Sequence, residues 1–219
     1  MHGQVLMQES QVKYLGVTFS DNLKWGAHIQ GVIKKANQKL GFLRRNLRGA
    51  PHRSKQTAYF SLVRSGMEYA APIWDPYQKG DISDLEKVQR QAARWVKSVY
   101  SRKPGAVTKL LKELEWTSLA DRRRNLKLIL LFKLTKDDIV LSLEDFDISY
   151  ADRPTKAASV IEEDGSVTSY KLDTLTAKKA PLQHSTLVST IPLWNKVPGD
   201  ILASSTSDIF KSALLSRAP

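Results

Sequence analysis

The sequence predicts a mainly α-helical protein: an N-terminal β-hairpin, a basic helical bundle, an irregular linker and a small C-terminal helical piece. Three observations carry this prediction. Apolar residues recur every three or four positions across residues 25–47 and 82–99, which is typical of amphipathic helices. β-branched and aromatic residues gather before residue 20, as they do in short strands. After residue 136 the chain becomes acidic, rich in Ser and Thr and weakly periodic.

The composition limits the class of protein. A chain of 219 residues makes one large or two small domains and can bury a hydrophobic core. Because cysteine is absent, disulfides and thiolate zinc sites are excluded, and an intracellular protein, cytoplasmic or nuclear, is expected. The longest apolar run, Leu126–Leu134, is interrupted by lysines, and the N-terminus lacks a signal-peptide pattern. The sequence therefore predicts no membrane span and no membrane partner.

The positive charge is concentrated in the first part of the chain. The net charge is +12, but residues 1–136 hold 26 Lys and Arg against 10 Asp and Glu, whereas residues 137–219 hold 8 against 12. A folded unit that tolerates so much self-repulsion is typical of proteins that bind RNA or DNA. The alternative is a basic surface that is merely solvated.

The N-terminal segment, residues 1–19, is predicted to form the hairpin. Val5–Met7 and Val12–Phe19 are the expected strands, and Glu9-Ser10 is the expected turn between them.

A basic helical bundle is predicted over residues 20–136. Its first helix ends at Gly49, and a second helix covers about Ser54–Tyr69, before Pro72. The apolar stripe of the first helix consists of Trp25, Ile29, Val32, Ala36, Leu40, Leu43 and Leu47. The cations of this helix that we expect to contact a ligand are Lys34, Lys35, Arg44, Arg45 and Arg48.

A third helix, residues 81–100, has the clearest pattern. Its apolar residues occupy one side, and a row of cations, Lys87, Arg90, Arg94 and Lys97, occupies the other. Acidic residues stand in its first turns, where the helix dipole favours them. The cationic row is therefore not simply part of an all-basic segment.

Two more helices complete the predicted bundle, at about Val107–Leu114 and from residue 118 to Lys136. In the second, Arg122, Arg123 and Arg124 lie near the positive end of the helix dipole, which opposes each cation by roughly 0.3–1 kcal/mol. A bound phosphate could offset this repulsion, and so could the carboxylates of Asp121, Glu115 or Glu113, or the acidic tail. The sequence leaves these possibilities open.

The last third of the chain is predicted to be less regular. Residues 137–180 are expected to form an acidic linker, with 145–180 either mobile or folded as irregular strands. A small C-terminal segment, 181–219, contains two apolar pieces, Leu187–Trp194 and Ile201–Leu215, that are expected to be ordered.

No catalytic, metal-binding or cofactor-binding set is predicted. Asp137-Asp138 and Tyr150-Ala151-Asp152-Arg153 resemble the carboxylate motifs of polymerases, but neither belongs to the carboxylate set that two-metal phosphoryl transfer requires. Basic helix faces can instead lie along a nucleic-acid backbone, where phosphate contacts release counterions. No base-reading pattern is evident, so recognition of shape and backbone is expected.

Four stretches carry a resemblance to a known family. They are Tyr14-Leu15-Gly16-Val17, KKANQKLGFLRRNLRG over residues 34–49, EYAAPIWDP over residues 68–76 and IPLWNKVP over residues 191–198. With them the chain resembles, almost end to end, the C-terminal thumb and post-thumb region of the reverse transcriptase of non-LTR retrotransposons, jockey-like LINE elements especially.

The resemblance implies specific roles. Tyr14, Leu15 and Gly16 match the hairpin that grips the primer, and residues 20–136 match the thumb. The three catalytic aspartates of the family would lie upstream, so the resemblance implies a fragment that catalyses nothing alone. Such a fragment would bind RNA or an RNA–DNA template–primer, and a palm or fingers polypeptide is a further expected partner.

Two alternatives remain open at this point. Met1 stands just before the hairpin, as in a truncated or decayed retrotransposon product, which would act as a helical protein-interaction scaffold or have no function. In addition, without a palm partner, Val5, Leu6, Val17 and Phe19 are expected to be exposed, so that the chain self-associates or requires another polypeptide.

Overall fold

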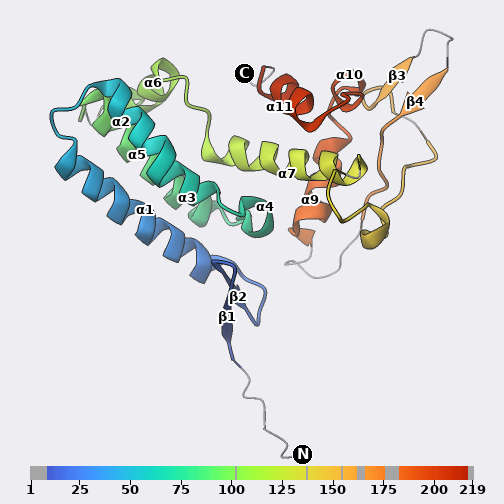
Figure 1. The fold of residues 1–219 in the computed structure, drawn as a ribbon, viewed down its shortest axis with the longest axis horizontal. Helices are drawn as coiled ribbons and strands as arrows, with labels where there is room; N and C mark the ends of the chain where they lie inside the picture. The colour runs from blue at the N-terminus through green and yellow to red at the C-terminus, as the bar shows by residue number, and fades with distance from the viewer. Residues whose placement is uncertain are drawn as a thin grey trace, which may run out of the picture. The chain divides into compact units, whose positions relative to one another are not determined.

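The chain divides into two compact units, residues 1–120 and residues 121–219. The computed structural model describes residues 9–101, 103–136, 138–153, 155–161, 166–175 and 183–216. Figure 1 shows the mainly helical architecture with its small N-terminal hairpin, so the predicted fold class is confirmed.

The first unit begins with an antiparallel hairpin of β1 (Gln11–Tyr14) and β2 (Val17–Ser20). Its turn is Leu15-Gly16, where φ is 45° and 85°, and two positive φ values are typical of the type I′ turns that join twisted strands. The prediction of one strand over Val12–Phe19 is therefore wrong, because these residues fold back on themselves at Leu15-Gly16. The predicted strand Val5–Met7 lies outside the described residues.

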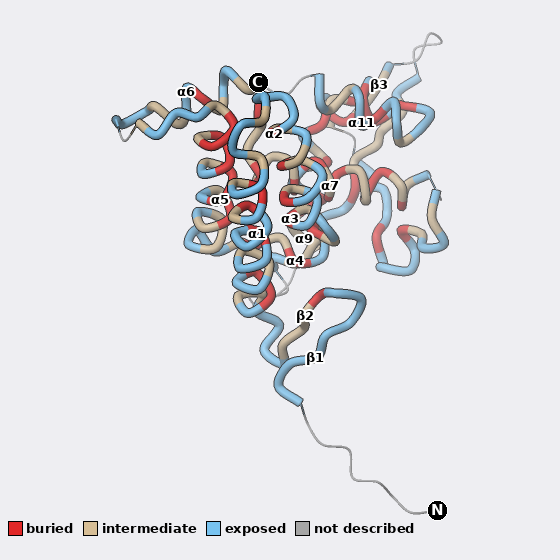
Figure 2. Tube along the Cα trace, turned by 60° about the vertical axis from the view of Figure 1, so that its left-hand side comes forward, coloured by how far each residue is buried: buried red, intermediate tan, exposed pale blue. Residues whose placement is uncertain are grey.

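The helix α1 (Gly26–Asn46) packs beside a second helical stretch. This stretch runs from α2 (His52–Ala58) through the π-helical η1 (Tyr59–Arg64) to α3 (Ser65–Glu68). Both helices match the predicted ones to within a few residues. Of the predicted stripe, α1 buries Ile29, Ala36, Leu40 and Leu43, and it also buries His28, which the stripe did not include. Figure 2 shows buried and exposed residues alternating along α1.

Three further helices complete the first unit: α4 (Ala71–Trp74), α5 (Lys79–Lys97) and α6 (Ala106–Glu113). Trp74 is fully buried, and its indole N–H donates to the carbonyl of Tyr69 (2.8 Å). At the end of α5, Ser98 takes a left-handed conformation (φ 54°), and its N–H bonds back to the last turn. The predicted helix of residues 81–100 is thus confirmed, shifted by two or three residues at each end.

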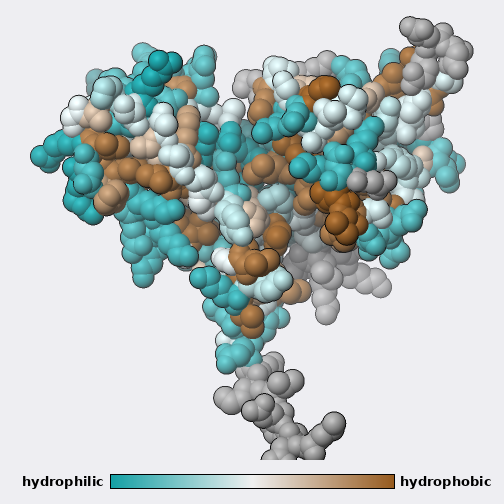
Figure 3. Space-filling view, viewed as in Figure 1, coloured by the Kyte–Doolittle hydropathy of each residue, from teal (hydrophilic) through white to brown (hydrophobic). Residues whose placement is uncertain are grey.

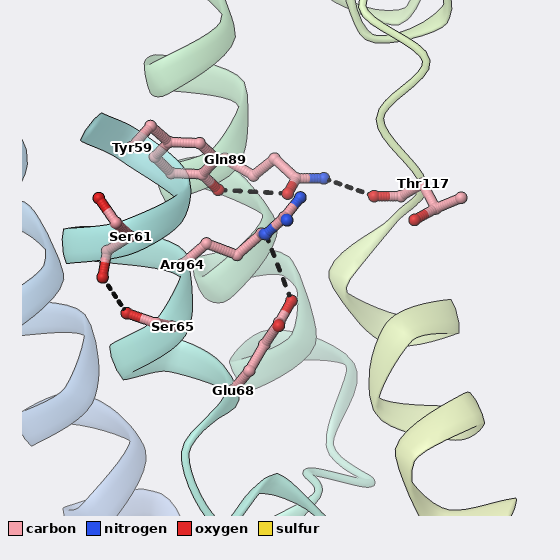
Figure 4. Close-up of polar contacts among 7 residues, drawn as sticks. All are labelled: Tyr59, Ser61, Arg64, Ser65, Glu68, Gln89 and Thr117. Atoms are coloured by element: carbon pink, nitrogen blue, oxygen red, sulfur yellow. Dashed lines mark hydrogen bonds and ion pairs between the residues drawn. The ribbon is translucent and has the colours of Figure 1, made fainter. Parts of the chain in front are cut away.

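A buried glutamine ties three parts of this unit together. Gln89 on α5 accepts a hydrogen bond from the Tyr59 hydroxyl (3.2 Å) and donates one to the Thr117 carbonyl (2.9 Å), as Figure 4 shows. The Tyr59 ring stacks on Trp116, with centroids 4.7 Å apart. The two hydrogen bonds of Gln89, buried beside the stacked rings, fix how η1, α5 and the segment before α7 pack.

The second unit contains most of α7 (Leu119–Thr135) and the elements that follow. These are the 3₁₀ turn η2 (Glu144–Phe146), the hairpin of β3 (Ser159–Ile161) and β4 (Val167–Ser169), and the helices α9 (Thr186–Trp194), α10 (Gly199–Leu202) and α11 (Ser207–Ser216). The aromatic centre of its core is Phe132 with Trp194 and Phe210, the two Phe rings stacking at 4.3 Å.

The described part of the expected linker contributes to this core. Leu143, Ile148, Ala158 and Leu172 are all buried within the same hydrophobic cluster as Phe132. Residues 145–180 were predicted to be either mobile or folded as irregular strands, and the described ones form irregular strands. Their scattered apolar side chains pack against residues that are far away in the sequence. The chain also divides after Ala120, not after residue 136. Whether any of the four predicted segments folds alone stays a prediction.

The IPLWNKVP stretch has a structural role. Asn195 brackets Leu172, accepting from its N–H and donating to its carbonyl, both at 2.9 Å, and the Trp194 indole donates to the Tyr170 carbonyl (2.8 Å). Ile191 is fully buried in the same core. This stretch therefore holds β4 and its continuation against α9.

Candidate nucleic-acid interface

Nearly all of the net charge belongs to the first unit. Residues 1–120 hold 20 Lys and Arg against 9 Asp and Glu, which leaves +11, whereas residues 121–219 hold 14 against 13. A region that attracts polyanions is accordingly expected on the first unit.

The predicted cations of α1 fall on two sides of the helix. Arg45 stands 11 residues after Lys34, close to three whole turns, so these two exposed side chains share one side of α1. Arg48 is also exposed, but it follows the end of the helix at Asn46. Lys35 is also exposed, but it lies about 100° around the helix from Lys34, where it lines a cleft with Lys39. In the sequence Lys35 is indistinguishable from Lys34, and only the elements that pack against α1 separate the two.

The α5 row is only partly free. Lys87 is exposed and forms an ion pair with Asp84 (2.6 Å), and Arg90 donates to the Ser83 carbonyl (3.3 Å). Arg94 and Lys97 are half-buried, and neither has a hydrogen bond or ion pair with the residues that the structure describes. These two side chains are the members of the row most ready to take a new anionic partner.

Arg44 joins the two predicted groups. Its Nη2 donates across to the Gln91 carbonyl of α5 (3.0 Å), and Gln91 stands between Arg90 and Arg94. The Arg44 Nε is buried and has no partner among the described residues. The side chain thus brings a positive charge to the line where α1 meets α5.

The arginine triplet belongs to α7. Arg124 forms an ion pair with Asp121 (3.2 Å), so the carboxylate that was one of the predicted alternatives is in place. Arg122 is half-buried and Arg123 is only 2% exposed, and both have interactions with other groups of the chain. The prediction that Arg123 contacts a ligand fails on this burial, because its guanidinium is not presented to solvent.

The primer-grip-like residues lie at the tip of the hairpin. Tyr14 is 65% exposed and Leu15 71% exposed, and the Tyr69 hydroxyl donates to the Leu15 carbonyl (2.9 Å). Val17, which was expected to be exposed, is buried, and Phe19 packs edge-on against Trp25. Val5 and Leu6 lie outside the described residues.

A different set of apolar side chains reaches the surface here. Figure 3 shows hydrophobic surface near the hairpin and α4. The exposed members of this patch, the hairpin patch, are Val12, Tyr14, Leu15, Leu23, Tyr69 and Ile73.

Membrane-spanning helices and groups of metal ligands are two further features that bear on function. In the described part of the chain, no helix combines the length and the apolar character needed to cross a membrane. Among the same residues, which do not include Asp137, no three His, Asp or Glu side chains are grouped as metal ligands.

Comparison with known proteins gives one informative match. Over 97 residues, the chain is 29% identical to a protein of Drosophila melanogaster named "Probable RNA-directed DNA polymerase from transposon BS". Part of this chain is thus similar to an RNA-directed DNA polymerase of a transposon. The match covers 43% of the chain and 11% of the relative, so the chain spans only a small part of such a polymerase. No family model and no solved structure matches the chain.

Proposed function

We propose that this chain is a non-catalytic, thumb and post-thumb fragment of a LINE-type, jockey-like reverse transcriptase, and that it binds RNA or an RNA–DNA template–primer. The observation that carries the proposal is the charge of the first unit, whose +11 coincides with cations on the outer sides of α1 and α5. The similarity of part of the chain to a transposon polymerase supports the choice of ligand.

Binding would use the phosphate backbone. Lys34 and Arg45 on α1, Arg48 just after it, and Arg94 and Lys97 on α5 would contact phosphates. Arg44 would add charge between the two helices. Lys87 and Arg90 would first have to leave Asp84 and the Ser83 carbonyl. Each phosphate contact releases counterions, so affinity would fall with salt, with a slope of about 0.9 per contact on a log–log plot for a duplex.

The test is charge reversal on α5. The variant Arg90→Glu, Arg94→Glu and Lys97→Glu should bind a short RNA–DNA hybrid more weakly than the wild type. Losing two or three phosphate contacts should lower the salt slope by roughly 2–3. Fluorescence anisotropy at several salt concentrations measures both quantities, and circular dichroism checks that the helices persist.

A matched control separates local contact from overall charge. Lys103, Lys109 and Lys112 are exposed cations of the same unit in and before α6, and their reversal changes the net charge equally. This control variant should retain most of the affinity and the wild-type salt slope. Equal loss in both variants would show that only general charge matters, and unchanged binding by the α5 variant would remove α5 from the interface.

A second candidate function follows from the hairpin patch. Its exposed Tyr14, Leu15 and Tyr69 side chains favour a protein partner, such as a palm or fingers polypeptide, and a helical interaction scaffold is the corresponding alternative to nucleic-acid binding. The two functions are separated by the salt titration, because an apolar contact does not weaken as salt rises.

The proposal also excludes polymerase activity by this chain alone. Primer extension on an RNA template, with magnesium or manganese supplied, should yield no product above a no-enzyme control. Template-dependent extension by the pure protein would contradict the proposed fragment.

A further inference from the structure

A cleft in the first unit lies between the hairpin, α1 and the η1–α3 stretch. Its volume is about 240 Å³. It is lined by Gly16, His28, Val32, Lys35, Ala36, Lys39, Val63, Gly66 and Tyr69. The lining contains two lysines and no carboxylate.

His28 holds a hydrogen-bond donor for which the described residues supply no acceptor. The ring is only 6% exposed, and its Nδ1 accepts a hydrogen bond from the Thr18 backbone N–H (3.1 Å). Nδ1 must therefore be unprotonated, and the neutral ring carries its proton on Nε2. Burial and the nearby charge of Lys35 lower the pKa of His28, which keeps the ring neutral at neutral pH.

The buried Nε2–H has no acceptor among the described residues. Nε2 is one of four buried side-chain nitrogens or oxygens without a hydrogen-bond partner there. His28 also makes edge contacts with the rings of Trp25 and Trp74, but an N–H facing a ring gains far less than one facing an oxygen. A buried donor left without an acceptor is destabilising, so an oxygen from outside the chain would be favoured here.

The two lysines specify the charge of that oxygen. Lys35 and Lys39 stand four residues apart, so they follow each other along one side of α1. Both are exposed, and neither forms an ion pair with a described residue. Lys39 Nζ lies 3.4 Å from the point that a Cβ of residue 66 would occupy. Because Gly66 has no side chain, the Lys39 ammonium can occupy the cleft beside it.

We propose that this cleft binds one phosphate group. His28 Nε2–H and the ammonium groups of Lys35 and Lys39 would donate to its oxygens, and the Tyr69 ring would form a wall. The volume is several times the roughly 30 Å³ that one water occupies in the liquid, which leaves room for a phosphate. The site is separate from the side of α1 that carries Lys34 and Arg45, so it does not depend on the proposed α1–α5 interface.

The phosphate could be a free or terminal group, or an internal phosphate of a nucleic acid. Both sources offer anionic oxygens. They differ in charge and in substitution, because a terminal phosphate is close to a dianion at neutral pH whereas an internal phosphate is a diester with one charge. Inorganic phosphate and dimethyl phosphate are therefore suitable probes of the two sources.

The experiment is an NMR titration of the full chain with each probe at constant ionic strength. The ring signals of His28 should shift saturably with at least one probe. In the variant Lys35→Gln and Lys39→Gln the apparent affinity should fall at least tenfold. Lys103→Gln with Lys109→Gln is the matched control, because it removes the same two charges from exposed lysines of the same unit that lie outside the cleft and outside the α1–α5 interface, and it should bind as the wild type does.

The outcomes separate clearly. Saturation by both probes assigns the site to an internal phosphate, and saturation by inorganic phosphate alone assigns it to a free or terminal one. If neither probe shifts His28, or if Lys103→Gln with Lys109→Gln weakens binding as much as Lys35→Gln with Lys39→Gln, the site does not exist. His28→Asn provides a second check, because it removes the Nε2 donor, and unchanged phosphate affinity in that variant would also overturn the proposal.

These results are independent of the α5 test. A chain that binds the RNA–DNA hybrid through α1 and α5 but gives no phosphate shift retains the proposed function and loses only this site. A chain that binds phosphate in this cleft but does not bind the hybrid retains this site and loses the proposed function.

Discussion

Replacing Gln89 with leucine should destabilise the first unit strongly although the change preserves side-chain size. Gln89 is fully buried and makes two hydrogen bonds, accepting from the Tyr59 hydroxyl (3.2 Å) and donating to the Thr117 carbonyl (2.9 Å). Leucine fills nearly the same space, so no large cavity forms. The cost therefore comes from the two polar groups that lose a partner.

The magnitude follows from those two groups. Depriving a buried polar group of its partner costs about 1–3 kcal/mol. Some recovery is expected, since Tyr59 has further interactions, so Gln89→Leu should lower the free energy of unfolding by about 2–4 kcal/mol. That is a large part of the roughly 5–15 kcal/mol that stabilises an ordinary domain.

Urea denaturation followed by tryptophan fluorescence is the appropriate assay. Four of the five Trp residues, Trp25, Trp74, Trp95 and Trp116, lie in the first unit, so the signal reports mainly on its unfolding. Gln91→Leu is the control, because Gln91 is exposed on the same helix and only its backbone carbonyl accepts from Arg44. The control should lie within about 0.5 kcal/mol of wild type. If both variants unfold at the same urea concentration, Gln89 does not hold η1, α5 and the Thr117 segment together.

Two further predictions concern His28 and Gly199. The pKa of His28 in the folded chain lies below its ordinary value of 6.5. Below about pH 6.5 the unfolded chain therefore binds a proton that the folded chain does not. The free energy of unfolding should fall as the pH drops below about 6.5, by at most about 1.4 kcal/mol per pH unit. The urea midpoint, measured at several pH values, should show this trend in the wild type and a weaker one in His28→Asn. If the midpoints of the two proteins change equally with pH, the prediction is wrong. Gly199→Ala should cost about 1–3 kcal/mol, because a Cβ there would overlap the Ser159 backbone. Gly31→Ala is the control, because the added Cβ meets nothing within 4 Å, and it should be neutral or slightly stabilising. If Gly199→Ala is as stable as the wild type, the contact between Gly199 and the Ser159 backbone is not tight.

The local elements could be predicted from the sequence because their signals are local. The apolar stripe of α1 and that of α5 each specify one buried side, and the observed helices bury most of the residues in both stripes. The turn at Leu15-Gly16 was not predicted, because strand-forming residues continue on both sides of Gly16. A glycine within such a run marks a turn only when the strands on either side pair, and that pairing is decided by the fold.

The candidate site was predictable only in part. The charge and the helix periodicity identified cations on α1 and α5, but not that Lys34 and Lys35 would face different surroundings or that Arg44 would bond to the Gln91 carbonyl. His28 had no recognisable spacing to other ligands, and its free Nε2 appears only once Thr18 is beside it. Arg123 looked like its neighbours in sequence but is buried.

By itself, the sequence determined that the chain would be largely helical, which side of each long helix would be apolar, and that the first part would be strongly basic, because composition and periodicity act through neighbouring residues. Tertiary structure alone decided which residues from distant segments meet. Ala158 and Leu172, in a stretch with weak local pattern, are buried with Trp194, and His28 becomes a neutral, unsatisfied donor only because Thr18 and Lys35 surround it. Burial and hydrogen-bond satisfaction are properties of such long-range contacts, which no local pattern specifies.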